Sequence, residues 1–148
     1  MKPFSIAENS LELKALAQEK RAFDSDTANM NFRGTVWAHI KRLGITPDKF
    51  YELTLLDDRQ FRKFKTGSAQ SVTFDTAIAV CIGLDLGLEY GESLLAKAGY
   101  TLDNQENLPY KMCLVRYRGR DITCCNEYLK DEGARLVREK ESRALTGF

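Results

Sequence analysis

The segment of residues 74–84 constrains the fold of this chain more than any other part of the sequence. Thr73 is a good helix N-cap, and the residues after it are apolar on nearly every side of the predicted helix. Such a helix has no face suited to water, so other elements must surround it. The rest of the chain carries helical patterns and only three prolines in 148 residues. The sequence therefore predicts an all-α fold with residues 74–84 as its central helix.

A short helix is predicted between Thr46 and Leu55. Thr46 is a good N-cap, and Pro47 stands in the first turn, where its missing N–H costs nothing. Apolar residues recur at helical spacing, so we expect one face of this helix to be buried. The residues expected to face inward are Phe50, Leu53 and Tyr51, with Leu56 buried in the turn that follows.

A second short helix follows after a turn of about three residues. Asp57 can cap it, Gln60 can complete a capping box, and Gly67 can end it. Its apolar face carries Phe61 and Phe64, and its other faces largely carry Arg59, Arg62, Lys63 and Lys65. Two short helices joined in this way, with basic residues on the second, have the geometry of a helix-turn-helix. The same spacing also fits an ordinary all-α domain with solvated basic faces.

The distribution of charge points to the same region. The net charge is +1, so no overall field draws this protein to nucleic acid. Residues 34–72 carry seven basic and four acidic residues, whereas residues 73–110 carry six acidic residues and one lysine. Residues 111–148 carry nine basic and six acidic residues. The basic stretch 34–72 is therefore the first place to look for a partner.

Helices are also predicted at both ends of the chain. Asn9 or Ser10 can cap a helix that continues to Phe23, with a break or a second cap at residues 24–27. The central part is completed by helices over residues 32–43 and 87–98.

The C-terminal third predicts a helix over residues 107–118 and a shorter one that reaches Leu129. Asp121 or Thr123 can cap the shorter helix. A basic cluster lies between the two helices, formed by Arg116, Arg118 and Arg120. The charge-rich residues 131–143 suit a peripheral or oligomerising helix.

Catalysis, metal binding and membrane insertion find no support in the sequence. His39 is the single histidine and the four cysteines include no CxxC pair, so neither a zinc site nor a nucleophile–base arrangement is predicted. The chain has no phosphate-binding or dinucleotide-binding glycine motif, so no cofactor is expected. No apolar run approaches the roughly 18 residues of a membrane span, and the N-terminus lacks the apolar run of a signal peptide. We therefore expect a cytoplasmic protein that is not an enzyme and engages no metal or membrane.

A pattern of caps and core positions links the central segments. The positions that carry it are Thr46, Phe50, Leu56, residues 57–67 and residues 73–84. From Trp37 to Leu86 this pattern resembles the phage-repressor helix-turn-helix family, also called the XRE or Cro-like domain. The resemblance implies a five-helix repressor-like core with additional N-terminal and C-terminal helices. The corresponding divisions are an N-terminal extension at 1–31, a helix-turn-helix domain at 32–102 and a C-terminal extension at 103–148.

The resemblance implies a sequence-specific double-stranded DNA-binding transcriptional regulator, most simply a repressor. It would read the major groove with the helix at about 58–65. Arg59 and Arg62 lie three residues apart and can bind guanine, whereas Lys63 and Lys65 suit phosphates; Gln60 can serve adenine or the capping box. The expected DNA-binding residues are Thr46, Asp58, Arg59, Gln60, Arg62, Lys63, Lys65, Thr66, Ser68 and Gln70.

Regulators of this kind bind two half-sites as two-fold dimers, so a homodimer is expected. Its candidate contact residues are Leu94, Tyr100, Leu102 and the region 121–145.

The alternative is a protein-interaction module on the same fold that has lost DNA binding, such as an adaptor, an antitoxin-like partner or a phage-borne inhibitor. Pro47 stands where the family has a Gln that contacts DNA, Tyr51 where it has Ala, and Leu55 where it has a turn Gly. Asp58 would sit near phosphate or accept a hydrogen bond from a cytosine amino group. The neutral net charge, Pro47 and Asp58 favour this alternative. A continuous exposed basic face on the second short helix would favour DNA.

Overall fold

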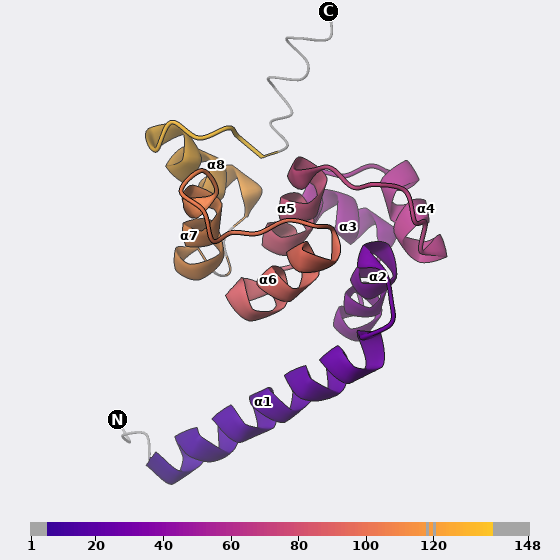
Figure 1. Ribbon diagram of the computed structural model, residues 1–148, viewed down its shortest axis with the longest axis vertical. Coiled ribbons are helices and arrows are strands. Elements are labelled where there is room, and N and C mark those ends of the chain that lie inside the picture. The colour runs from indigo at the N-terminus through magenta and orange to yellow at the C-terminus, as the bar shows by residue number, and fades with distance from the viewer. Residues whose placement is uncertain (1–5, 118, 120, 138–148) are drawn as a thin grey trace, which may run out of the picture. The chain divides into compact units, whose positions relative to one another are not determined.

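The computed structural model describes residues 6–117, 119 and 121–137, and every regular element in these ranges is an α-helix (Figure 1). The described residues contain no strand, which confirms the predicted all-α class. The chain divides into two units, Met1–Met30 and Asn31–Phe148.

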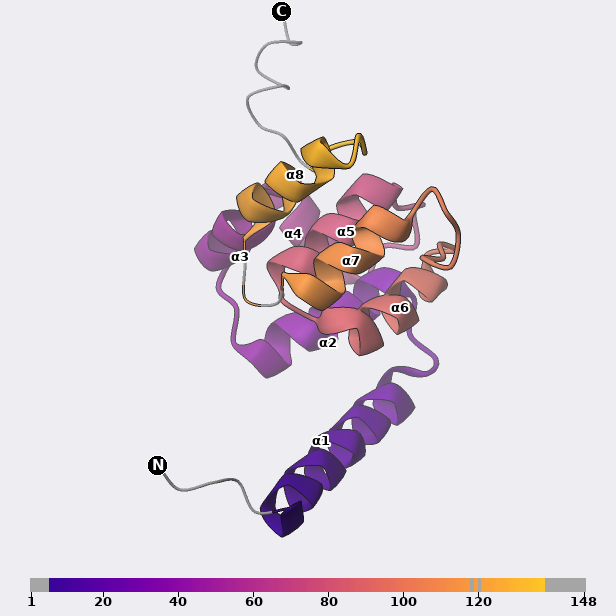
Figure 2. The same cartoon turned by 90° about the vertical axis from the view of Figure 1, so that its left-hand side faces the viewer.

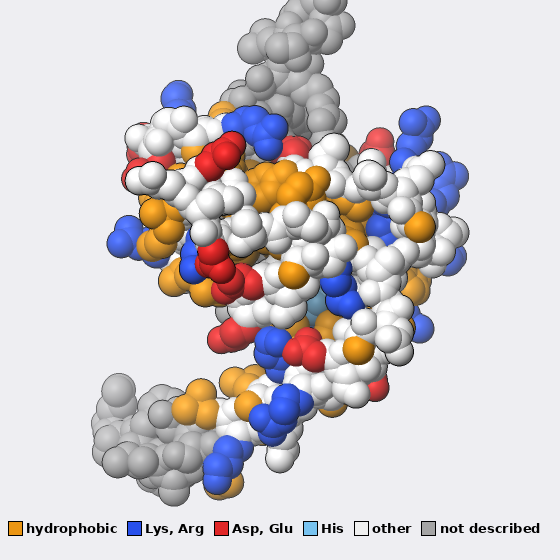
Figure 3. All heavy atoms as spheres, in the orientation of Figure 1, with side chains coloured by type: hydrophobic (Ala, Val, Ile, Leu, Met, Phe, Trp, Pro, Cys, Tyr) orange, Lys and Arg blue, Asp and Glu red, His pale blue; other side chains and the backbone are white. Residues whose placement is uncertain are grey.

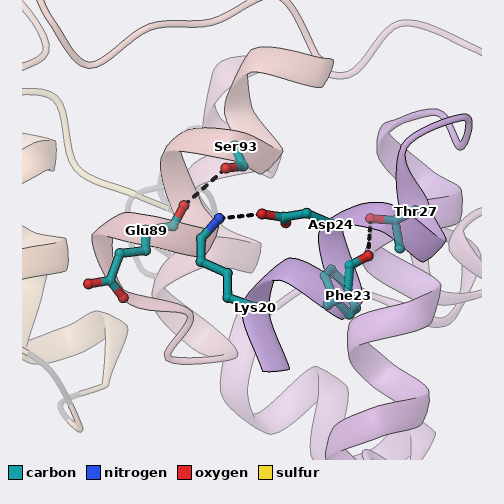
Figure 4. Close-up of polar contacts among 6 residues, drawn as sticks. All are labelled: Lys20, Phe23, Asp24, Thr27, Glu89 and Ser93. Atoms are coloured by element: carbon teal, nitrogen blue, oxygen red, sulfur yellow. Dashed lines mark hydrogen bonds and ion pairs between the residues drawn. The ribbon is translucent and has the colours of Figure 1, made fainter. Parts of the chain in front are cut away.

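The first unit contains a single helix, α1 (Ile6–Thr27). It begins upstream of Asn9 and Ser10, so the predicted caps are wrong. The predicted break at residues 24–27 is also wrong, because contacts one helical turn apart continue the helix there. Lys20 Nζ lies 2.5 Å from Asp24 Oδ2, and Thr27 Oγ1 donates to the Phe23 carbonyl at 2.8 Å; both contacts are drawn in Figure 4.

The second unit is arranged around α5 (Phe74–Gly83), as the sequence predicts. Residues 76–83 are all buried, and α5 packs against helices on several sides. Figures 1 and 2 show these neighbours around it. They are α3 (Pro47–Thr54), α6 (Gly87–Lys97), α7 (Leu108–Arg116) and α8 (Ile122–Asp131). The remaining helices, α2 (Phe32–Leu43) and α4 (Asp58–Thr66), pack against each other.

The predicted caps begin four of these helices. Each cap side chain accepts a hydrogen bond from the backbone N–H three residues later, which satisfies a donor that the helix cannot satisfy itself. The caps are Thr46, Asp57, Thr73 and Asp121, at distances of 3.2, 3.0, 3.2 and 2.9 Å. Gly67 ends α4 in the left-handed conformation, as predicted, and Gly44 ends α2 in the same way.

The backbone of α3 lies close to Gly83 of α5. A Cβ at this position would lie 2.6 Å from the Leu53 carbonyl oxygen and 2.8 Å from Thr54 Cγ2. The absence of a side chain at Gly83 therefore sets the distance between the two helices.

Three expectations about individual side chains are wrong. Tyr51 is 40% exposed, because α3 buries only the narrow stripe of Phe50 and Thr54. Leu94 and Leu102 are buried in the core, at 1% and 2% exposure. Neither leucine is therefore available to a dimer surface within this unit.

The C-terminal segment departs from the predicted helix over residues 131–143. The helix α8 ends at Asp131 and residues 132–137 are irregular. The Asn126 side chain accepts from the Val137 N–H at 2.7 Å and donates to the Val137 carbonyl at 2.8 Å, and the Tyr110 hydroxyl donates to the Arg135 carbonyl at 2.7 Å. These long-range partners replace the helical bonds of this segment. Arg118, Arg120 and the remainder of the region 121–145 lie outside the described residues.

Candidate nucleic-acid interface

Aromatic packing fixes the position of α4 on the rest of the unit. The rings of Phe61 and Phe64 lie 5.3 and 5.6 Å from that of Phe50 on α3, and Phe61 lies 5.5 Å from Trp37 on α2. Edge contacts of this kind favour defined ring orientations as well as burial. The helix is thereby held with one face inward and the opposite face turned out.

The outward face of α4 carries the predicted basic residues. Arg59, Arg62 and Lys65 are exposed, and Lys63 is half-buried. At 100° per residue, Arg59, Arg62 and Lys63 lie opposite the aromatic face, whereas Lys65 lies to one side. Among the residues that the structure describes, none of these four cations lies within ion-pair distance of a carboxylate. Figure 3, in the orientation of Figure 1, shows Lys and Arg side chains gathered over the region of α4.

The N-terminal end of this helix is acidic and only partly capped. Asp57 accepts from the Gln60 N–H, and Asp58 is exposed in the first turn. The capping box is half formed, because Gln60 Oε1 is buried and accepts no hydrogen bond within the described ranges. Gln60 is half-buried, so its amide is less accessible than the two arginines.

The remaining predicted polar residues make local hydrogen bonds. Thr46 Oγ1 caps α3, and Thr66 Oγ1 donates to the Lys63 carbonyl at 3.2 Å. Ser68 Oγ accepts from the Gln70 N–H at 3.3 Å. Thr46, Thr66 and Gln70 are exposed and Ser68 is half-buried. These bonds give the loop after α4 a defined shape beside the basic face.

The turn before α4 contains a strained residue. Leu55 has φ 59° and ψ 20°, in the left-handed region that glycine adopts most easily. The side chain of Leu55 is half-buried against the core. The three residues 55–57 thus join α3 to α4 as a tight turn with Leu56 buried at 1% exposure, as predicted.

Two residues that the sequence analysis did not identify hold the loop after α4. Asn31 Nδ2 donates to the Gly67 carbonyl at 2.8 Å, and Arg33 Nη1 donates to the carbonyls of Ser68, at 3.2 Å, and Gln70. Asn31 is also the N-cap of α2. The sequence contains a signal for each residue. Asn31 stands directly before an apolar helix, where a cap is expected, and Arg33 lies on the same helical stripe as Val36, Trp37 and Ile40, where burial is expected.

The described part of the chain contains no helix that is both long and apolar enough to cross a membrane. In the same ranges no three His, Cys, Asp or Glu residues converge as metal ligands. The chain matches no protein-family model, no curated protein and no solved structure.

Proposed function

We propose that this protein is a sequence-specific double-stranded DNA-binding regulator that reads the major groove with the outward face of α4. The observation that carries the proposal is the division of α4 into a buried aromatic face and an exposed face with Arg59 and Arg62. An arginine can bind guanine through two hydrogen bonds, and a protruding helix of this kind fits the major groove.

Neighbouring residues support the same proposal as phosphate contacts. Lys63 and Lys65 flank the two arginines, and exposed Thr66 and Gln70 follow them. Contacts of this class position a protein on DNA without reading its sequence. Recognition is thus a non-catalytic event, and we propose repression by occupancy as its simplest consequence.

The test is duplex binding followed by fluorescence anisotropy across a salt series. A duplex is first selected from a random library with the wild-type protein, and its Kd is then compared with that of Arg59→Ala/Arg62→Ala. We expect the double variant to weaken binding by about 30-fold or more, since each bidentate pair contributes roughly 1–3 kcal/mol.

The matched control is Lys14→Ala/Arg21→Ala, which removes the same charge from exposed positions of α1, outside both α4 and the candidate dimer region. We expect it to alter the Kd by less than about threefold. Equal losses in the two double variants, or no competable binding at about 50 mM salt, would contradict the proposal.

A homodimer is part of the proposal, because two copies can engage two half-sites one helical turn apart. Sedimentation of the protein with a selected duplex measures the stoichiometry. A palindromic selected site bound by one copy would contradict this part.

A protein-interaction module is the second candidate, and exposed Asp58 and Tyr51 favour it. Asp58 places negative charge at the end of α4 that would approach DNA, and Tyr51 presents an aromatic ring to solvent. The variant Asp58→Asn separates the candidates. On the DNA proposal it changes duplex affinity several-fold, upward if Asp58 lies near phosphate and downward if Asp58 accepts from a cytosine amino group, whereas a module without DNA binding shows no change in duplex affinity.

A further inference from the structure

A buried arginine lies between the start of α2 and the loop after α4. Arg33 is 3% exposed, and its Nη1 donates to two peptide carbonyls, those of Ser68 and Gln70. Its Cζ lies 6.0 Å from the centre of the Phe64 ring. Carbonyls and ring faces attract a cation but carry no net charge. Within the described ranges no carboxylate lies at ion-pair distance from Arg33, so its buried charge has no counterion, which is a costly arrangement.

The guanidinium also has a hydrogen-bond donor to spare. Arg33 Nε is buried and has no hydrogen-bond partner among the described residues. A buried donor without an acceptor is destabilising, so this atom is suited to an acceptor from outside the chain. Burial lowers the pKa of Arg33 from its ordinary value, yet a guanidinium stays charged at neutral pH.

Arg33 lines a cleft of about 280 Å³, and none of the described residues that form its walls is acidic. Lys97, Ser68 and Ser71 line the same cleft. The cleft includes the start of α2, whose first turn has no acidic residue. The positive end of a helix adds to the attraction of an anion at this place.

The walls of the cleft are held in place at both ends of the loop. Asn31 binds the Gly67 carbonyl at 2.8 Å, and the Tyr100 hydroxyl donates to the Val72 carbonyl at 2.5 Å. The loop therefore keeps its shape without a ligand, which lowers the entropic cost of binding one.

We infer that this cleft binds a single phosphate-class oxyanion on Arg33. A phosphate group supplies the missing negative charge, an acceptor for Nε, and further acceptors for the hydroxyl of Ser71. The anion can be free phosphate or one phosphate of a nucleic-acid backbone. The site goes beyond the proposed DNA recognition, because it requires none of the α4 cations.

The experiment places a carboxylate in the cleft and measures phosphate binding. Ser71→Glu adds an internal counterion while leaving the hydrogen bonds of Arg33 intact. Thermal unfolding is followed against inorganic phosphate, with sodium chloride at equal ionic strength as reference. We expect a saturable rise of the wild-type Tm with phosphate, and a phosphate Kd about tenfold weaker or more in Ser71→Glu.

Two further variants and one spectroscopic measurement locate the site. Gln105→Glu makes the same charge change at an exposed position outside the cleft, and Arg59→Ala/Arg62→Ala removes the α4 arginines; both should respond to phosphate as wild type does. In NMR spectra the Arg33 Nε–H resonance should shift as phosphate is added. The inference is overturned if phosphate acts no differently from chloride. It is overturned equally if Ser71→Glu responds like Gln105→Glu.

Duplex binding distinguishes free phosphate from a backbone phosphate as the ligand of the cleft. If a backbone phosphate occupies the cleft, Ser71→Glu weakens duplex affinity and lowers the salt slope by about one. If free phosphate is the ligand, duplex binding is unchanged while the Tm response is lost. The phosphate titrations need no DNA, so failure of the proposed DNA recognition leaves them intact and separately measurable.

Discussion

The helices α4 and α5 are neighbours in the sequence and similar in length and capping, yet they stand in opposite environments. Every residue of α5 from Thr76 to Gly83 is buried, whereas α4 buries Phe61 and Phe64 and exposes basic residues on its other side. One helix is surrounded by the unit, and the other lies at its surface.

The two environments determine which property each kind of substitution changes. In α5 a side chain of different volume no longer fits its close-packed neighbours, so we expect such a substitution mainly to lower the stability of the fold. The outward face of α4 is in contact with water, so we expect a change of charge there to alter ligand binding and to leave the stability of the fold nearly unchanged.

The largest loss of stability is expected at Gly83, where the backbone of α3 lies against α5. Gly83→Ala places a methyl group 2.6 Å from the Leu53 carbonyl oxygen, which cannot move without displacing α3. We expect a loss of about 1–3 kcal/mol in the free energy of unfolding, measured by urea denaturation.

The control for this substitution is Gly91→Ala on α6. The added methyl group there lies 2.9 Å from Leu114 Cδ1, the end of a flexible side chain. A change below about 1 kcal/mol is expected, helped by the better helix propensity of Ala. Equal losses at the two glycines would remove the special role of the α3–α5 approach.

The next effect concerns His39, a buried polar residue of α2, the helix that packs against α4. His39 is 1% exposed, and its Nδ1 accepts from Arg42 Nε at 2.9 Å. Burial, reinforced by the charge of Arg42, lowers the pKa of His39 to about 3. The imidazole is thus neutral in the folded protein but takes up a proton in the unfolded chain below a pH of about 6.5.

The contribution of neutral His39 to the free energy of unfolding is therefore fully present above a pH of about 6.5. It decreases as the pH drops toward the pKa of His39 in the folded protein. We expect a loss of at most about 1.4 kcal/mol per pH unit in this range. His39→Asn keeps an acceptor for Arg42 and should flatten the pH dependence between pH 6.5 and 5, followed by urea denaturation. Parallel curves for variant and wild type would show that His39 is protonated inside the fold.

The smallest effect is expected in the turn before α4. Leu55→Gly and Leu55→Ala remove the same packing, but only Gly adopts φ 59° without strain. We expect the Gly variant to be more stable than the Ala variant by about 1 kcal/mol in thermal unfolding. Equal stability would mean that the turn relaxes out of the left-handed conformation when the side chain is lost.

Much of the local structure could be predicted because it depends on neighbours in the chain. The caps Thr46, Asp57 and Thr73 act on an N–H three residues away, and the glycines at 44 and 67 act on their own backbone. One prediction failed because distant partners intervene. Residues 132–137 are irregular because Asn126 and Tyr110 hold them, and no pattern within the segment reveals those bonds.

The candidate site divides along the same line. The basic residues of α4 and the aromatic face behind them follow from helical spacing alone, since position on a helix decides which side chains share a face. The roles of Asn31 and Arg33 do not, because their partners lie more than 30 residues away in the loop after α4. Local signals in the chain predicted most of the helices, the caps of four of them and the helix that had to be buried, since these depend on short-range hydrogen bonds and hydrophobic periodicity. Tertiary packing alone brings α3 against Gly83, leaves Tyr51 facing water and encloses Arg33 without a counterion among the described residues, since each depends on which surfaces meet after the chain has folded.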